Sequence, residues 1–372
     1  MKIGITYDLR AEYLRQGYGE EATAEFDSIE TIDAIDATLR ALGHVTDRIG
    51  NIRNLAERLA EGVRWDLVFN IAEGLHGFGR EAQVPALLDA FNIPYTFSDP
   101  LVLTLALHKA TAKRLVCGMG LATPDFVVVS READVDAVDL PWPVFAKPVA
   151  GGSSAGVSTA SKVHDKHELA GTCRDLLQRF HQPVLVETFL PGREFTVGVM
   201  GSAGKARVLG VMEVILLPAA EPAVYSYSNK RNYHGRVDYT LIEDELAQRA
   251  SAMALTIWNE LGCRDAGRLD LRCDANGNLN FLEINPLPGL HPVDSDLVVI
   301  GRFLGISHFS LIESIVTSAL ERLPARTLEV GDQPPGANFL WQPPLRPPIA
   351  PIAQQQKLDP SVVSGFRSVE GN

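Results

Sequence analysis

The sequence predicts an α/β (α+β) protein whose first domain contains a parallel sheet. Strand-like and helix-like segments alternate over the first hundred residues, and several further strands and helices follow them. A chain of 372 residues with 46% hydrophobic and 22% charged residues can bury the cores of two or three domains. The predicted divisions are an N-terminal α/β domain (1–104), a central subdomain (105–190), a C-terminal subdomain (191–323) and a proline-rich, disordered tail (324–372).

The elements follow one another in a regular order. The expected N-terminal elements are strand 2–8, helix 27–44, strand 65–74, helix 81–93 and strand 94–99. The expected central elements are helix 105–121, strands 123–130 and 142–149, a Gly/Ser run, a helix and strand 183–190. The expected C-terminal elements are strands 193–201 and 206–215, a polar loop, helix 243–262, a hairpin over 267–285 and a last helix.

The composition excludes several classes of protein. A formal net charge of −12 argues against nucleic acid as the main partner, because binding to phosphates needs a basic surface. No signal peptide is visible, and no apolar run is long enough to span a bilayer, so a cytoplasmic protein is expected. The four cysteines lack metal-ligand spacing and indicate reduced thiols, with a disulfide as the alternative.

The hairpin over 267–285 carries the clearest chemical signal. A type I′ turn at Asn276-Gly277 would place Asp270 opposite Glu283 and Arg268 opposite Asn285, all on one face. The other face, formed by Leu269, Leu271, Leu282 and Ile284, would point to a core. Two facing carboxylates repel each other unless a cation lies between them. The pattern therefore indicates a Mg²⁺ site, with a solvated charged face as the alternative of equal weight.

Two further segments are typical of a phosphate and nucleotide site. Lys147 ends a strand immediately before the run Gly151–Gly156, where glycine backbone N–H groups can surround an anion, although the spacing is not that of a Walker A loop. A flexible surface loop is the alternative. The apolar strand ending at Glu187 could form the wall for a planar base, although Glu187 and Glu194 could equally be surface acids.

Several single residues are weaker candidates. Lys109 is expected to be a surface lysine of its helix, and Glu25 could simply favour a helix N-terminus. Lys230 lies in a polar, aromatic-rich loop that could form a lid, whereas His76 and His291 are more often structural than catalytic in such positions.

The order of these features resembles the ATP-grasp superfamily, and over roughly residues 1–320 it resembles the D-alanine–D-alanine ligases. The similar segments are "LHGFG", "IPYTFSD", "KPVAGGSSAG", "GREFTVGVMG", "GRLDL" and "FLEINPLPGLHP". The resemblance implies an ATP-grasp fold that holds the nucleotide between the central and C-terminal subdomains. It also implies a ligase that joins two amino acids through an acylphosphate and releases ADP and phosphate, in peptidoglycan (cell wall) biosynthesis.

The resemblance also implies a role for each matching residue. Glu25 would receive the ammonium group of the first amino acid, with Ser153 beside it. Arg268 and the N–H of Gly289 would stabilise the oxyanion, and Ser295 would bind the second substrate's carboxylate. The residues implied for ATP are Lys109, Lys147, Ser154, Glu187, Phe189, Leu190, Glu194 and Lys230. The residues implied for two Mg²⁺ ions, or Mn²⁺ in their place, are Asp270, Glu283 and Asn285.

The sequence departs from the family at three places around the amino-acid pockets. Arg231 stands where a tyrosine follows the lid lysine, and it could bind an acidic group or point to solvent while Tyr233 takes the tyrosine's place. The stretch "HGFGREAQ" is altered, and the spacing from Gly289 to Ser295 is one residue longer than usual. None of these changes affects the nucleotide or metal positions.

Three functional hypotheses follow. The first is a ligase that makes D-alanyl-D-alanine or a close dipeptide, and the second is a ligase of specialised metabolism with another amino-acid or acyl substrate. The third is a nucleotide-binding regulatory protein without catalysis. The expected partners are amino acids and ATP, with no nucleic acid or membrane, a homodimer as an option, and an unidentified partner for the proline-rich tail.

Overall fold

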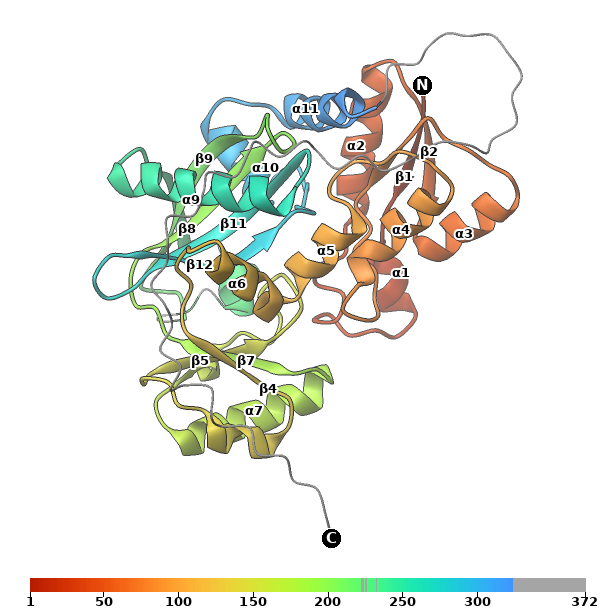
Figure 1. Cartoon of the computed structure of the whole chain (residues 1–372). Coiled ribbons are helices and arrows are strands. Elements are labelled where there is room, and N and C mark those ends of the chain that lie inside the picture. Colours follow the sequence, from red (N-terminus) through yellow and green to blue (C-terminus); the bar gives the residue numbers. More distant parts are fainter. Residues whose placement is uncertain (222–223, 225, 232, 324–372) are drawn as a thin grey trace, which may run out of the picture. The chain divides into compact units, whose positions relative to one another are not determined.

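The computed structural model describes residues 1–221, 224, 226–231 and 233–323. Within these residues the chain forms three separate β-sheets, each covered by helices (Figure 1). The tail predicted from residue 324 onward lies outside the described residues. No single helix in the described ranges is long and apolar enough to cross a membrane, whereas the last two helices pass that test together but are bent by 113°.

The first sheet is parallel, as predicted, with the strand order β2-β1-β3. Its alternate side chains face two different cores, and helix α2 packs Ile35 and Leu39 against Ile3 and Ile5. The elements are β1 (Lys2–Thr6), α1 (Arg10–Arg15), α2 (Ile29–Ala41), β2 (Val45–Gly50), α3 (Ile52–Ala60), β3 (Leu67–Asn70), a 3-10 turn (Arg80–Ala82), α4 (Gln83–Ala90) and α5 (Pro100–Leu107).

Three predictions for the first 121 residues were wrong. The sequence analysis missed β2 and α3. In "VTDRIG" the charged residues Asp47 and Arg48 are adjacent, so this half-exposed strand lacks the regular alternation of apolar and polar residues. The strand predicted over 94–99 is reduced to a single bridge between Tyr95 and Val68. The helix predicted over 105–121 breaks at His108, whose backbone pairs with Ala150 and whose ring accepts the N–H of Thr111. This break places Lys109 at the start of helix α6.

The second sheet is antiparallel and has the order β4-β7-β5-β6. Helix α7 covers one of its faces with Leu169, Cys173 and Leu176, which pack against Val144 and Val186. Because successive side chains along a strand point to opposite faces of the sheet, the neighbouring residues on β5 and β7 point to the other face. The elements are α6 (Lys109–Gly118), β4 (Phe126–Val129), a 3-10 helix (Glu132–Ala137), β5 (Val144–Pro148), a 3-10 turn (Thr159–Ser161), β6 (Lys162–Val163), α7 (Lys166–Phe180) and β7 (Val184–Thr188).

The third sheet is antiparallel with the order β10-β9-β8-β11-β12, and its middle strand β8 is buried on both faces. On β8, Phe195 and Val197 pack on the side of α9, whereas Gly198 lies so close to α10 that a Cβ there would meet Leu297 at 3.1 Å. The elements are β8 (Glu194–Met200), β9 (Arg207–Leu216), α8 (Tyr227–Arg231), β10 (Val237–Leu241), α9 (Glu245–Leu261), β11 (Ala266–Cys273), β12 (Leu279–Asn285), α10 (Asp296–Phe303) and α11 (His308–Glu321). One last helix was predicted after the hairpin, whereas the structure has two, α10 and α11.

Asp265, which is fully buried, joins the first and third sheets. Its carboxylate accepts the N–H of Phe97 at 2.7 Å, the hydroxyl of Ser318 at 2.8 Å and a guanidinium nitrogen of Arg322 at 2.6 Å. These partners come from two distant stretches of the chain, the segment between α4 and α5 and the C-terminal end of α11. A buried carboxylate with this number of donors stabilises the fold because each donor would otherwise lose its partner.

We expect Asp265→Asn to lower the free energy of unfolding by about 2 kcal/mol, since the amide cannot accept all of these donors and cannot pair with Arg322. Urea unfolding would measure this change. The exposed Asp238, replaced in the same way, serves as the control and should leave the unfolding midpoint unchanged. An equal stability of both variants would contradict the role of Asp265.

Candidate active site

Two adjoining cavities lie where loops from all three sheets meet. The larger has a volume of about 340 Å³, and the smaller has a volume of about 110 Å³. They share seven lining residues, namely Lys109, Gly151, Ser153, Lys230, Arg268, Glu283 and Asp296. Every site residue assigned from the family resemblance lines one or both cavities, whereas the weaker candidates His76 and His291 line neither. Arg231 ends α8, and its side chain lies outside the described residues.

The β11–β12 hairpin brings the expected acidic pair together. Asp270 pairs with Glu283, and Arg268 pairs with Asn285, as the sequence predicted. Burial and the neighbouring Glu283 raise the pKa of Asp270 to about 6, against the attraction of Arg268. Burial acts on Glu283 as well, but Lys109 and Lys147 outweigh it and lower its pKa to about 2. The two facing carboxylates therefore differ strongly in their affinity for protons.

The second half of the hairpin differs from the prediction. A bulge after Asp270 shifts the register by one residue, so that Leu271 pairs with Phe281 instead of Leu282. Leu282 is released from the core and lines the smaller cavity. The turn is not type I′, because only Gly277 of the Asn276-Gly277 pair has a positive φ, of 81°. Bulges of this kind are frequent beside active sites, where they redirect a side chain.

Lys147 and Glu187 lie on the sheet face opposite α7. Together with Lys113 they form a cluster of ion pairs. Both oxygens of the Glu187 carboxylate are engaged, one by Lys147 and the other by Lys113, each at 2.8 Å. Lys113 is fully buried, and Glu187 is only 3% exposed. Burial lowers the pKa of Lys113 to about 8, although Glu187 opposes the shift. The sequence reading missed Lys113, since a lysine on an amphipathic helix gives no sign of burial.

The Gly/Ser run has the backbone of an anion-binding loop. Ser153 and Ser154 have positive φ values of 50° and 55°, which residues with a side chain rarely adopt outside functional turns. The N–H of Gly152 donates to the carboxylate of Glu25, and a Cβ at Gly152 would lie 2.4 Å from that carboxylate. The ammonium group of Lys109 donates to the carbonyl of Gly151 and lies 3.3 Å from Glu283. The loop thus joins the candidate phosphate residues to Glu25.

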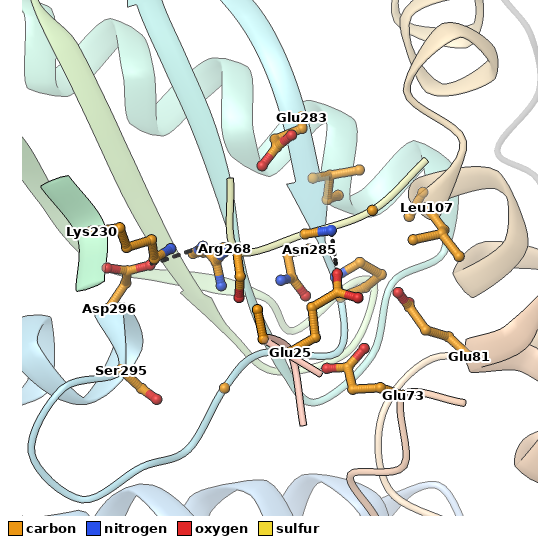
Figure 2. A pocket seen from close by; sticks show the side chains of 18 of the residues that line it. Glu25, Glu73, Glu81, Leu107, Lys230, Arg268, Glu283, Asn285, Ser295 and Asp296 are labelled. Atoms are coloured by element: carbon orange, nitrogen blue, oxygen red, sulfur yellow. Dashed lines mark hydrogen bonds and ion pairs between the residues drawn. The ribbon is translucent and has the colours of Figure 1, made fainter. Parts of the chain in front are cut away.

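Figure 2 shows the larger cavity, with Glu25, Arg268, Asn285 and Ser295 around it. Gly289 belongs to its wall, and a Cβ at Gly289 would lie only 2.9 Å from the Ser295 hydroxyl. That hydroxyl in turn accepts the N–H of His291 at 2.8 Å. A glycine is therefore required for the close approach of this loop to Ser295. The arrangement offers backbone N–H groups, a guanidinium and carboxylates to one small polar ligand.

Comparisons with known proteins agree with this geometry. Residues 115–317 match a protein family described as "D-ala D-ala ligase C-terminus". A D-alanine–D-alanine ligase of Aquifex aeolicus is 33% identical over 295 residues, which cover 78% of this chain and 94% of the relative. The chain belongs to the D-alanine–D-alanine ligase family. A ligase of Rhizorhabdus wittichii is 31% identical and covers 87% of this chain and 100% of the relative.

The fold of this ligase is the ATP-grasp fold. The structure of D-alanine–D-alanine ligase from Bacillus anthracis complexed with ATP superposes with a TM-score of 0.65 at 21% identity, covering 86% of this chain and 98% of that chain. The family membership makes the protein an ATP-grasp ligase that forms a peptide bond, as the sequence had implied.

The smaller cavity of the ligase is lined by the candidate nucleotide residues. The ring of Phe189 lies 4.4 Å from the ammonium of Lys162 and 5.4 Å from the guanidinium of Arg272. Arg272 also pairs with Glu194 at 2.9 Å. Leu190 contributes to the same wall. The sequence reading missed Arg272, although its position two residues after Asp270 on one strand face could have indicated it.

The larger cavity of the ligase has an acidic end that the sequence reading did not anticipate. Arg80 pairs with Glu25 at 2.6 Å and lies 3.5 Å from Glu73 and 3.8 Å from Glu81. Burial raises the pKa of Glu81 to about 7 against the attraction of Arg80, and burial together with Glu81 raises the pKa of Glu73. The altered segment "HGFGREAQ" supplies Arg80 and Glu81, so the departure from the family pattern is located at this end.

Proposed function

We propose that the ligase activates the carboxylate of one amino acid with ATP and joins it to the amine of a second, making D-alanyl-D-alanine or a close dipeptide. A carboxylate is a poor electrophile at neutral pH, so it attacks the γ-phosphate and becomes an acylphosphate. The amine then displaces phosphate through a tetrahedral intermediate. The observation that supports this proposal is the pairing of Asp270 with Glu283 beside Arg268 and Lys109, at the junction of the two cavities.

The residues present fit magnesium. Among the described residues, no three His, Cys, Asp or Glu side chains cluster as a metal centre. Mg²⁺ is usually held by only one or two carboxylates together with substrate phosphates, and Asp270, Glu283 and Asn285 offer such a partial set. When bound there, two Mg²⁺ ions, or Mn²⁺, would neutralise phosphate charge.

The protein's own side chains would bind and orient the nucleotide and the two amino acids. Lys109, Lys147 and Lys230 would hold the phosphates with Ser154, and Phe189 and Leu190 would enclose the base. Glu187 and Glu194 would contact adenine and ribose. Glu25 and Ser153 would orient the first amino acid, while Arg268 and the N–H of Gly289 stabilise the oxyanion and Ser295 binds the second substrate. These assignments rest on the family resemblance and on the common location of the residues in the two cavities.

The second candidate function is a ligase that uses a different first amino acid, and the acidic end of the larger cavity favours it. The pairing of Arg80 with Glu25 occupies the carboxylate that would receive the substrate's ammonium. Arg231 remains a candidate for substrate binding, and Tyr233, whose hydroxyl donates to Asp294 at 2.8 Å, is the alternative. A cytoplasmic location, a homodimer and a partner for the tail remain predictions.

A screen of amino-acid pairs for ADP formation, with mass detection of the product, tests the proposal. We expect ADP, phosphate and one dipeptide in equal amounts with D-alanine or a close relative, loss of turnover with EDTA, and recovery with excess Mg²⁺ or Mn²⁺. Binding of ATP without ADP formation from any pair, including acidic acceptors, would contradict the proposal and favour a regulatory ATP-binding protein.

A further inference from the structure

Asp296 lies inside the active site but has no role in the mechanism described above. It is the first residue of α10, is only 9% exposed, and lines both cavities. One carboxylate oxygen lies 3.3 Å from the ammonium of Lys230 and 3.3 Å from Nε of Arg268 (Figure 2). The two cations come from α8 and β11, so this single carboxylate links three separate elements of the site.

The contact with Arg268 is an ion pair on the Nε side of its guanidinium. Asp296 and Asp270 both approach Nε, at 3.3 Å and 3.6 Å. A guanidinium is planar, so carboxylates that attract its Nε side favour orientations in which the two Nη nitrogens are directed away from them. Those nitrogens are the part of the side chain that can meet an oxyanion. An oxyanion donor is effective only when it points to the place where charge develops, so the orientation of the plane matters for the rate.

The position of Asp296 is itself well fixed. Leu297 and Ile300 of α10 are buried in the core beside β8 and β9, so the helix has little freedom to move. An acidic residue in the first turn of a helix is favoured by the helix dipole, which keeps the carboxylate ionised. Burial raises the pKa of Asp296, but Lys230 and Arg268 more than offset this effect, and the pKa is lowered. The residue is therefore a rigid anion between two cations.

We propose that Asp296 is a positioning residue that holds the Arg268 guanidinium toward the reacting carboxyl group and keeps Lys230 at the phosphate side of the cavity. This inference rests on the proposed ligase function. Asp296 adjoins Ser295, the candidate contact of the second substrate. One short segment would therefore contact both the second substrate and Arg268. The orientation of Arg268 is thus coupled to the loop that receives the second amino acid.

The test compares Asp296→Asn, which keeps the shape and removes the charge, with Asp296→Glu, which keeps the charge. We expect Asp296→Asn to lower kcat by about 10- to 100-fold, because a small misplacement of a catalytic group costs this order of rate. The melting temperature should stay close to that of the wild type, whereas the KM for ATP should rise, because Lys230 would no longer be held at the phosphate side. Asp296→Glu should recover part of the loss. Glu245→Gln, which removes an exposed acid from the first turn of α9, is the matched control.

A double-mutant cycle with Arg268→Lys separates positioning from a merely structural role. If Asp296 acts through Arg268, the loss in kcat of the double variant is smaller than the product of the two single losses. The inference would be overturned by an unchanged kcat in Asp296→Asn or by multiplicative losses in the double variant. It would also be overturned if the Asn and Glu variants lost the same activity and both had a lower melting temperature. Absence of ADP from the wild type would instead overturn the proposed function, and the inference with it.

Discussion

Replacement of Arg268 by alanine is expected to lower kcat by about 10²- to 10³-fold, the usual effect of removing one oxyanion donor. The tetrahedral intermediate of the second step carries a negative charge that the ground state lacks, so the interaction is made only as the reaction proceeds. Arg268 is buried, pairs with Asn285 across the hairpin and lies at the junction of the two cavities. The loss should therefore appear in kcat and kcat/KM to a similar extent.

Steady-state ADP formation at saturating ATP would measure this effect, with thermal unfolding as a check on folding. Arg268→Lys should recover little, since an ammonium keeps the charge but cannot match the planar fork of the guanidinium. Arg249→Ala, at an exposed position on α9, is the control and should keep wild-type turnover. Near-normal kcat in Arg268→Ala would show that another group stabilises the oxyanion.

The sequence could predict which residues of the hairpin face one another because this pairing depends on local rules. The pairing of Asp270 with Glu283 follows from strand alternation and a nearby turn, and this pairing is confirmed. The register beyond Asp270 was wrong because a bulge has no sequence signature as strong as a turn. The bulge also explains why Leu282 was assigned to the core but lines the smaller cavity.

The residues that the sequence did not reveal depend on contacts between distant elements. Asp296 contacts Lys230 from α8 and Arg268 from β11, and no local pattern at the start of a helix distinguishes such an acid from an ordinary capping charge. Lys113 and Arg80 have the same property, since each becomes notable only through its buried partners. The parallel first sheet, in contrast, followed from the alternation of strands and helices.

Glu187→Ala is expected to destabilise the fold by about 3–5 kcal/mol, because removing one partner of a buried ion pair leaves an uncompensated charge. Here the loss would leave two buried cations, Lys113 and Lys147, each of which is held by Glu187 at 2.8 Å. Both lysines also repel one another. Urea unfolding would measure the change. Glu132→Ala removes the partner of Arg174 at an exposed site and should leave the unfolding midpoint nearly unchanged.

The pH dependence of this variant provides a second, independent check. The pKa of Lys113 is already lowered from 10.5 to about 8, mainly by burial, and Glu187 is the group that limits this shift. Without Glu187 the folded state binds the proton still less tightly than the unfolded chain. Since the unfolded state then holds more protons, the free energy of unfolding of Glu187→Ala must rise between about pH 8 and pH 10. A stability of the variant that stays flat or falls over this range would mean that Lys113 finds another anion when Glu187 is absent.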